Sequence, residues 1–427
     1  MEKELIFPRD IEASLLRWIE RRETYAIKGP RQSGKTTLLR ILEDDLKKKG
    51  INTVFLNFED PDILEAFETN PKEYIRSFLT KEGKYCFLMD EYHYVKDPGK
   101  KLKLLYDTFE NSKFIVTGSS SLELSGAMAK FLVGRVFFFE LFPFNFHEFL
   151  TAKDPRLAKI YEEKNNMVKE FLSNKVEVEK DIFLKELAPF FDQYVIFGGY
   201  SAVIKAEDFD TKRAILKNIY DTYISKDVVE FLKVTDAFKY RHVVRALAVL
   251  IGNLINYNEI CSACNTYYKE LKRMISILSE TYIINLIQPF YRNPLTELKK
   301  VPKLYFFDLG LRNYIIDNFN PLEKRTDSGA LVENFVFLSL KNNFPEAIIN
   351  YWRTIAKAEV DFVLKIKDEI IPIEVKYQSF KEPKVSKGLR SFIKSYKIKK
   401  AIVITKNFWS KIKINNTDIL FIPACYL

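Results

Sequence analysis

The sequence predicts a multidomain α/β protein whose amino-terminal part is a parallel sheet connected by helices. Short apolar segments alternate with helical segments between residues 24 and 140, which is typical of parallel strands joined by crossover helices. A turn with two glycines follows the first apolar segment, and an acidic pair follows the third. Helices and strands alternate again from residue 328 onward, which predicts a second α/β domain.

The amino-terminal elements follow one another in a regular order. Residues 11–22 predict an amphipathic helix, and residues 36–50 predict a helix that ends at Gly50. The five expected strands contain the segments ETYAIKG, INTVFLNFED, YCFLMDEY, SKFIVTGSSS and VGRVFFFEL.

The pattern changes after Pro143. A lysine-rich helical stretch extends to residue 232, with an interruption at FGGYSAV, and several short helices and extended segments follow up to residue 320. The last part predicts a helix, three strands, a helix and a strand. The length of 427 residues exceeds what one hydrophobic core usually serves and suggests roughly three domains. The changes of pattern near residues 145, 235 and 325 divide the chain into four expected parts, at 1–145, 146–235, 236–325 and 326–427.

Composition limits the classes of protein that this chain represents. Lys and Arg number 67 against 57 Asp and Glu, and the net charge of +10 favours polyanionic partners such as DNA and nucleotides. Four cysteines are too few for a disulfide scaffold, which favours a reducing compartment. The start of the chain is not typical of a signal peptide, and the apolar runs are short or broken by charges. We therefore expect a soluble cytoplasmic protein without a membrane partner.

The segment from Gly29 to Thr36 matches G-x-x-x-x-G-K-[ST] between a predicted strand and a predicted helix. Glycines let the backbone wrap around phosphate oxygens, and the helix start offers unpaired N–H groups. Lys35 then supplies positive charge, and the Thr36 hydroxyl is a ligand for Mg²⁺. The expected ATP-binding residues are Gly29, Pro30, Arg31, Gln32, Ser33, Gly34, Lys35, Thr36 and Thr37.

Asp90 and Glu91 end the third predicted strand. Ligands bind at the carboxyl edge of a parallel sheet, so Asp90 is expected to hold Mg²⁺, and Glu91 to polarise the attacking water. An acidic pair at a strand end is otherwise a surface feature, but the phosphate loop upstream favours the catalytic interpretation. Lys35 and Glu91 are thus the predicted catalytic residues.

Small hydroxyl residues follow the fourth predicted strand. Ser119 and Ser120 are candidates to sense the γ-phosphate, or they belong to a turn that caps the next helix. Arg135 interrupts an apolar run and therefore needs a partner. One expectation is that Arg135 contacts phosphate or a neighbouring subunit, and the other is that it forms an ion pair with an acid such as Glu140. The sequence does not decide between these two interpretations.

The segments GPRQSGKTT, FLMDEYHYV, VTGSSS and GRVFFFELFPFNFHEF, in this order, resemble a prokaryotic family of AAA-type ATPases. The resemblance implies an AAA-type P-loop domain, a helical linker, a winged-helix region and a C-terminal domain like the restriction-endonuclease fold. His93 departs from the pattern, because many relatives have glutamine after the acidic pair, so no role is transferred to its side chain.

Residues 266–280 predict the second helix of that winged-helix region. Tyr267, Leu271, Met274, Ile275 and Leu278 recur at three- and four-residue steps, with lysines and an arginine between them. Such a basic face enters a DNA groove, docks a protein or is simply solvated. The nearby pair Cys261 and Cys264 lacks further ligands for zinc, so two small helical residues are the favoured interpretation.

The C-terminal segments contain acidic residues of a second candidate site. Glu374 and Lys376 lie on one face of a strand, Asp361 lies in the preceding strand, and Glu333 lies on the preceding helix. Carboxylates and a lysine are the set needed for metal-dependent hydrolysis of phosphodiesters. By resemblance the four residues occupy the positions of the restriction-endonuclease signature; otherwise they belong to a sheet that binds DNA or a protein.

The sequence thus predicts an ATPase that uses ATP and Mg²⁺ as a conformational switch coupled to nucleic-acid binding. One alternative is a metal-dependent nuclease that the ATPase regulates. Another is a signalling or scaffold ATPase that binds protein partners. Self-association is left open, because Arg135 acting across a subunit boundary requires a second copy.

Overall fold

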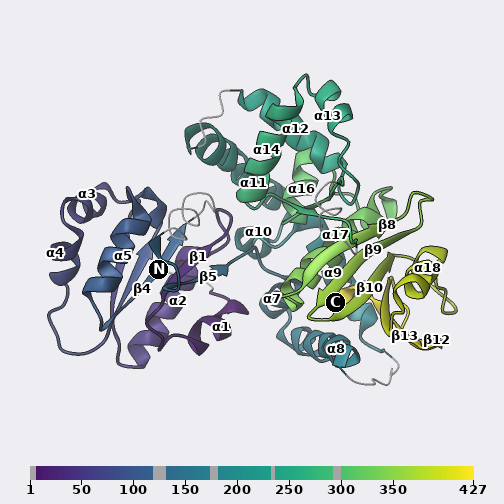
Figure 1. Cartoon of the computed structure of the whole chain (residues 1–427), viewed down its shortest axis with the longest axis horizontal. Helices are drawn as coiled ribbons and strands as arrows, with labels where there is room; N and C mark the ends of the chain where they lie inside the picture. Colours follow the sequence, from purple (N-terminus) through teal and green to yellow (C-terminus); the bar gives the residue numbers. More distant parts are fainter. Residues whose placement is uncertain (1–5, 119–130, 174–180, 232–235, 292–299) are drawn as a thin grey trace. The chain divides into compact units, whose positions relative to one another are not determined.

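The computed structural model describes residues 6–118, 131–173, 181–231, 236–291 and 300–427. The chain forms two compact units (Figure 1). The first contains residues 1–144, 225–232 and 280–283, and the second contains residues 145–224, 233–279 and 284–427. The finer division into four parts stays a prediction.

The first unit is built on a five-stranded, fully parallel sheet in the order β2-β3-β4-β1-β5. Its strands are β1 (Thr24–Lys28), β2 (Asn52–Asn57), β3 (Tyr85–Asp90), β4 (Ser112–Gly118) and β5 (Val136–Glu140). All five predicted strands are confirmed. Because β4 lies between β1 and β3, the carboxyl ends of these three strands are neighbours at one edge of the sheet.

Helices connect the strands of the first unit. They are α1 (Ile11–Arg17), α2 (Lys35–Lys48), α3 (Pro61–Thr69), α4 (Pro71–Arg76) and α5 (Pro98–Thr108), with the 3₁₀ turn η1 (Tyr92–Tyr94) after β3. Helix α1 was predicted to end at residue 22, but it ends at Arg17, because the chain turns at residues 18–23. The helix α2 ends before Gly50, whose φ of +73° is readily accessible only to glycine.

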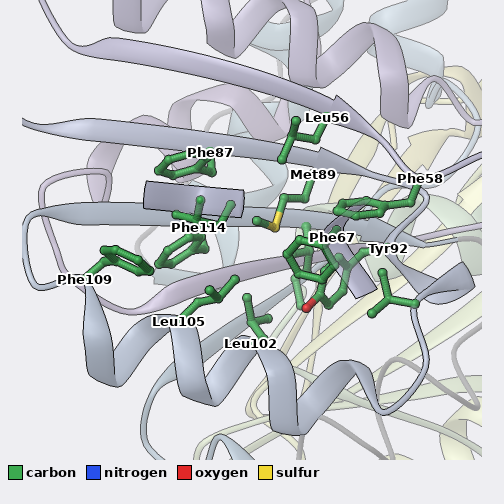
Figure 2. Packing of buried hydrophobic residues seen from close by; sticks show 14 of the residues in the cluster. Leu56, Phe58, Phe67, Phe87, Met89, Tyr92, Leu102, Leu105, Phe109 and Phe114 are labelled. Carbon is green, nitrogen blue, oxygen red and sulfur yellow. The ribbon is translucent and has the colours of Figure 1, made fainter. Parts of the chain in front are cut away.

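Apolar side chains cover both faces of this sheet. On one face an aromatic-rich cluster includes Phe87 and Phe114, whose stacked rings have centroids 5.5 Å apart (Figure 2). Leu102 and Leu105 of α5 pack against the same cluster. A second cluster joins α1 and α2 to the other face. Burial on both faces explains why β3 and β4 are nearly continuous apolar runs.

The second unit begins with helices and a short antiparallel pair. The helices are α7 (Phe146–Lys153), α8 (Pro155–Ser173), α9 (Leu184–Phe197), α10 (Ser201–Lys205), α11 (Phe209–Thr222), α12 (Ala237–Val249), α13 (Tyr257–Ala263), α14 (Tyr268–Glu280) and α16 (Leu309–Ile316). A π-helical segment, η2 (Tyr223–Phe231), follows α11, and from residue 225 onward it belongs to the first unit. Strand β6 (Ile284–Ile287) pairs with β7 (Lys303–Phe306), and Leu254 adds one bridge to Lys303.

A six-stranded mixed sheet completes the second unit, in the order β12-β13-β11-β10-β9-β8. Its elements are α17 (Ser328–Asn343), β8 (Ile348–Arg353), β9 (Glu359–Ile366), β10 (Glu369–Lys376), α18 (Lys387–Tyr396), β11 (Lys400–Thr405), β12 (Ser410–Ile414) and β13 (Thr417–Pro423). The predicted helix, three strands, helix and strand are confirmed, and the sequence analysis missed β12 and β13. The fold class, α/β with two sheet-containing parts, is therefore the one predicted.

Close backbone contact explains why residue 310, in α16, is a glycine. A Cβ on Gly310 would lie 1.9 Å from the carbonyl oxygen of Phe197, so only glycine fits. Asp308 caps α16 by accepting from Leu311 N, and its other oxygen accepts from Gly199 N, both at 2.7 Å. The FGGYSAV segment is thus the point where α9 and α16 meet.

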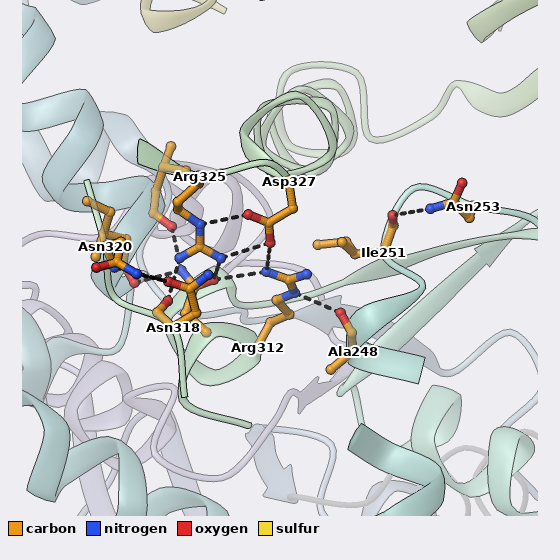
Figure 3. A network of polar contacts seen from close by, with 11 residues as sticks. Ala248, Ile251, Asn253, Arg312, Asn318, Asn320, Arg325 and Asp327 are labelled. Atoms are coloured by element: carbon orange, nitrogen blue, oxygen red, sulfur yellow. Dashed lines mark hydrogen bonds and ion pairs between the residues drawn. The ribbon is translucent and has the colours of Figure 1, made fainter. Parts of the chain in front are cut away.

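A buried ionic network ties α16 to its surroundings (Figure 3). Arg312 donates to the carbonyl oxygen of Ala248 at 2.8 Å and to Asp327 at 2.6 Å. Arg325 donates to both oxygens of Asp327, at 2.8 and 2.9 Å. Burial alone would raise the pKa of Asp327, but the two arginines outweigh it and hold that pKa at about 2. The carboxylate is therefore charged and bridges two guanidinium groups.

Candidate functional site

The predicted phosphate loop lies between β1 and α2, as the motif requires. Gly34 has a φ of +93°, which favours glycine, and it directly precedes the first residue of α2. A Cβ at Gly29 would lie 2.0 Å from the carbonyl oxygen of Leu141, so the chain after β5 passes too close for any other residue. A different physical constraint thus requires glycine at each of these two positions.

The side chain of Lys35 is buried against this loop. Its Nζ donates to the carbonyl oxygens of Gly29 at 3.1 Å and Pro30 at 2.8 Å. The ammonium group therefore lies on the same loop whose backbone amides open α2. A cation beside a helix N-terminus is an arrangement suited to binding an anion such as a phosphate group.

Arg9 supports the loop from outside the motif, and the sequence analysis did not find it. It is buried, and its Nη1 donates to the carbonyl oxygen of Ser33 at 2.8 Å while Nη2 donates to that of Phe142 at 2.7 Å. Its guanidinium group also lies 4.4 Å from the ring centroid of Phe144. A single arginine before a helix has no local pattern that marks this role.

Asp90 is the centre of a buried hydrogen-bonded group at the carboxyl edge of the sheet. The Thr36 hydroxyl donates to Asp90 Oδ2 at 2.6 Å, and the Thr117 hydroxyl donates to Oδ1 at 2.5 Å. Thr117 also accepts from the backbone N–H of Glu91 at 3.0 Å. Three chain segments, from α2, β3 and β4, thus converge on one carboxylate. The hard oxygens of Thr36 and Asp90, beside the phosphate loop, fit the ligand preference of Mg²⁺.

Glu91 follows Asp90 with a left-handed backbone, at φ +51°. Burial alone would raise the pKa of its carboxyl group, but His93, Lys35 and Arg31 outweigh burial and lower that pKa to about 2. The buried His93 has its Nδ1 3.0 Å from Glu91 Oε2. The residue that departs from the family pattern therefore contacts the predicted catalytic glutamate, which is ionised at neutral pH.

The other residues predicted near the nucleotide have different outcomes. Ser119 and Ser120 lie outside the described residues, and Thr117, at the end of the same strand, contacts Asp90. Arg135 has its Nη2 3.6 Å from Asp107 Oδ1. Arg135 therefore forms an ion pair, but its partner is Asp107 and not Glu140. Glu140 instead accepts a hydrogen bond from the Tyr282 hydroxyl at 3.2 Å.

The C-terminal residues come from α17, β9 and β10. Asp361 Oδ2 accepts from the backbone N–H of Val375 at 2.8 Å, and the Nζ of Lys376 lies 3.3 Å from Glu374 Oε1. Asp361 and Glu333 share one partner, the buried Lys303, described next.

Lys303 of β7 lies among the carboxylates, and the sequence analysis missed it. Its Nζ lies 3.0 Å from Glu333 Oε1, 2.6 Å from Glu359 Oε1 and 3.8 Å from Asp361 Oδ1. The Tyr305 hydroxyl donates to Glu333 Oε1 at 2.6 Å. Burial would lower the pKa of Lys303, but the carboxylates outweigh it and raise that pKa. For Glu333, burial raises the pKa to about 7 despite the ammonium group.

This carboxylate cluster does not fit a divalent metal ion as arranged. Across the part of the chain that the structure describes, no group of three or more His, Cys, Asp and Glu side chains is placed to hold one. Three carboxylates surround an ammonium group instead. Glu374 Oε2 is buried and lacks a hydrogen-bond partner among the described residues. We therefore derive no hydrolytic step at this cluster.

Helix α14 buries one face and exposes basic residues on the other. The predicted apolar stripe is confirmed for Leu271, Met274, Ile275 and Leu278, which are buried. Tyr267 precedes the helix and is 65% exposed, so its assignment to the stripe was wrong. Elsewhere on the helix, Lys272 has its Nζ 4.9 Å from the ring centroid of Tyr268 and 5.9 Å from that of Tyr257. Cys261 and Cys264 are free thiols.

Comparison with known proteins assigns the first unit to a class. Residues 21–150 match the family described as AAA domain. The parallel sheet, the loop after β1 and the acidic pair after β3 are consistent with this match, which makes these residues similar to AAA-type P-loop domains. Residues 189–322 and 328–424 match two domains of unknown function, DUF8612 and DUF4143.

Similar full-length proteins occur in bacteria and archaea. An uncharacterized protein of Haemophilus influenzae is 23% identical over 99% of this chain and 98% of its own length. The uncharacterized protein MJ1544 of Methanocaldococcus jannaschii is 26% identical over 85% of this chain and 76% of its own length. The uncharacterized protein Rv2008c of Mycobacterium tuberculosis is 23% identical over 94% of this chain and 80% of its own length.

Solved structures show a more distant similarity. The Aeropyrum pernix ORC1 protein in complex with DNA has a TM-score of 0.31, with 13% identity over 73% of this chain and 94% of that one. AMPPCP-bound DnaA from Aquifex aeolicus has a TM-score of 0.30, with 15% identity over 63% of this chain and 86% of that one. At these scores no property is transferred to this chain. Among the described residues, no helix combines the length and the apolar character needed to cross a membrane.

Proposed function

We propose that this protein binds ATP with Mg²⁺ at the loop from residue 29 to residue 37 and hydrolyses it as a conformational switch. The observation that carries the proposal is the buried group in which Thr36 and Thr117 both donate to Asp90. This group joins the phosphate loop to the end of β3, next to the ionised Glu91. A phosphate site, a metal-ligand pair and a base thus lie at one sheet edge.

Each residue has a distinct task in this proposal. The Lys35 ammonium group and the backbone amides of the loop bind the phosphates, and Thr36 and Asp90 hold Mg²⁺, which when bound neutralises the charge that develops on the transferred phosphoryl group. Glu91 accepts a hydrogen bond from the attacking water and orients it, because its carboxylate is charged at neutral pH. Thr117 holds the backbone of Glu91 in place.

We propose that the output of the switch is nucleic-acid binding by the second unit. The order α12, the Leu254 bridge, α13, α14, β6 and β7 supports the proposal of a winged helix in this unit, with α14 as its recognition helix. Lys269, Lys272 and Arg273 lie on α14, whose apolar face is buried. The net charge of +10 favours the same partner.

The order α17, β8, β9, β10, α18 and β11 supports a restriction-endonuclease-like fold for the C-terminal part. The nuclease alternative is disfavoured, because Lys303 lies among the acidic residues that such an enzyme uses for its metal. A protein-binding ATPase remains a second candidate. The observation that favours it is the exposure of Phe238 and Val249 on α12, at 73% and 62%.

The test compares ATP turnover by wild type, Lys35→Ala and Lys48→Ala, each with and without single- and double-stranded DNA. Lys48 is the matched control, because it lies on the same helix but is exposed and pairs only locally with Asp45. We expect Lys35→Ala to lose turnover while Lys48→Ala retains it. Full turnover by Lys35→Ala would refute the ATPase proposal. DNA binding whose affinity falls with salt, by a slope of about −0.9 per phosphate neutralised, supports the nucleic-acid output; its absence favours a protein partner.

A further inference from the structure

Strand β7 holds an ammonium group inside the C-terminal carboxylate cluster. Lys303 is 3% exposed, and its Nζ is within 3.0 Å of oxygens of Glu333 and Glu359 and 3.8 Å from Asp361. Its backbone is fixed on both sides, because it pairs with Ile287 of β6 and with Leu254. The lysine is therefore placed by the fold rather than by a flexible surface segment.

Buried carboxylates that stay ionised need a positive partner. Taking them out of water without a positive partner is costly, and a divalent ion or an ammonium group meets that need. A divalent metal ion draws its oxygen ligands to about 2.0–2.6 Å, so it occupies the same centre as Nζ and excludes it. Since Lys303 belongs to the chain, its charge is present at any concentration of metal.

Other side chains of the chain meet the remaining needs of the cluster. Tyr305, on the same face of β7, donates to Glu333, and Lys376 pairs with Glu374. Asp361 accepts from the backbone of β10. Each of these acids thus has at least one partner that the protein itself supplies, while Glu374 Oε2 has none among the described residues.

We propose that Lys303 takes the place of a divalent metal ion in this cluster, so that the carboxylates anchor strand β7 to the C-terminal sheet instead of supporting hydrolysis. In this arrangement the C-terminal part serves as a metal-independent binding and coupling module. The link joins the β6–β7 pair, which follows α14, to helix α17 and strand β9.

The test measures Mn²⁺ binding, by electron paramagnetic resonance and by the shift in melting temperature, without nucleotide. All proteins include Asp90→Asn, which removes the carboxylate expected to bind metal beside the phosphate loop. With Lys303 present, we expect no bound Mn²⁺ and no shift. Lys303→Ala is expected to melt at a lower temperature and to bind one Mn²⁺ that restores it. Adding Asp361→Asn to Lys303→Ala is expected to abolish that response.

Two results would overturn the inference. One is Mn²⁺ bound by the chain with Lys303 present and lost on Glu374→Gln, because the buried Glu374 Oε2 would then be a metal ligand. The other is a folded Lys303→Ala protein that binds no Mn²⁺ and whose melting temperature does not change when Mn²⁺ is added. If Lys303→Ala does not fold, Lys303→Ser, which also clears the centre that Nζ occupies, replaces it; if neither folds, the measurement on the Lys303 chain decides alone. No readout uses ATP, so failure here leaves the proposed ATPase function untouched.

Discussion

Thr117 connects Asp90 and Glu91, the two acidic residues of the proposed nucleotide site, and replacing it tests that site directly. Its fully buried hydroxyl donates to Asp90 Oδ1 at 2.5 Å and accepts from the Glu91 N–H at 3.0 Å. Valine has almost the same shape and lacks both interactions. Thr117→Val therefore removes the link between Asp90, the proposed metal ligand, and Glu91, the proposed base, without creating a cavity.

The magnitude follows from these two bonds. A hydrogen bond to a charged group contributes about 1.5–3 kcal/mol, and an unpaired N–H adds to the loss, so we expect unfolding of the first unit to require about 2–4 kcal/mol less. Glu91 has a strained φ of +51°, and without the bond its backbone relaxes. A displacement of about 1 Å costs on the order of 100-fold in turnover.

The assay is phosphate release from ATP, with binding of a fluorescent ATP analogue and thermal unfolding measured in parallel. We expect Thr117→Val to lose about 100-fold in kcat, which is about 2.7 kcal/mol of barrier, while analogue binding changes little because the phosphate loop is intact. Thr117→Ser retains the hydroxyl and is the control. Wild-type turnover by Thr117→Val would refute the reasoning, and equal losses in both variants would mean that the methyl group matters rather than the hydroxyl.

Three further predictions concern other contacts. His93→Ala is expected to lower kcat more than KM, because Glu91 loses the partner 3.0 Å away, with His93→Gln restoring part of the rate in the same turnover assay. Asp327→Asn leaves two buried guanidinium groups without their shared anion and is expected to cost about 3 kcal/mol in thermal unfolding. Because the pKa of Asp327 is about 2, against 3.8 for an ordinary aspartate, its stabilisation is complete above pH 3.8 and is lost as the pH falls toward 2, and that part of the acid sensitivity should vanish in the variant. Gly310→Ala places a Cβ 1.9 Å from the oxygen of Phe197 and is expected to lower the yield of folded protein, whereas Gly329→Ala, with open space, should not.

Local rules were enough to predict most elements. The strands β1 to β5 are short apolar runs between helical segments, and the phosphate loop is a short contiguous motif. Its Gly34 is required by the local backbone conformation, whereas Gly29 is required by the close approach of Leu141. The missed strands β12 and β13 lie at the chain end, beyond the last helix that the pattern marked. They show that a run of alternating residues near a terminus is easily left as a loop.

The site divides in the same way. The motif marked Lys35, Thr36, Asp90 and Glu91 as candidates, because phosphate and metal chemistry need those residue types next to a strand end, and the structure brings Thr36 and Asp90 into contact. No pattern near Arg9 identified its contact with the phosphate loop.

What the sequence determined by itself is therefore the chemistry written in contiguous residues: the anion-binding turn, the acidic strand end and the order of strands and helices. Backbone requirements and side-chain periodicity act over a few residues, so a single chain segment reveals them. Only the tertiary structure decided that Thr117 lies between β1 and β3, and that Lys303 enters a cluster of acids from later in the chain. Strand order and burial select those partners by packing and charge compensation, which act between residues that are distant along the chain.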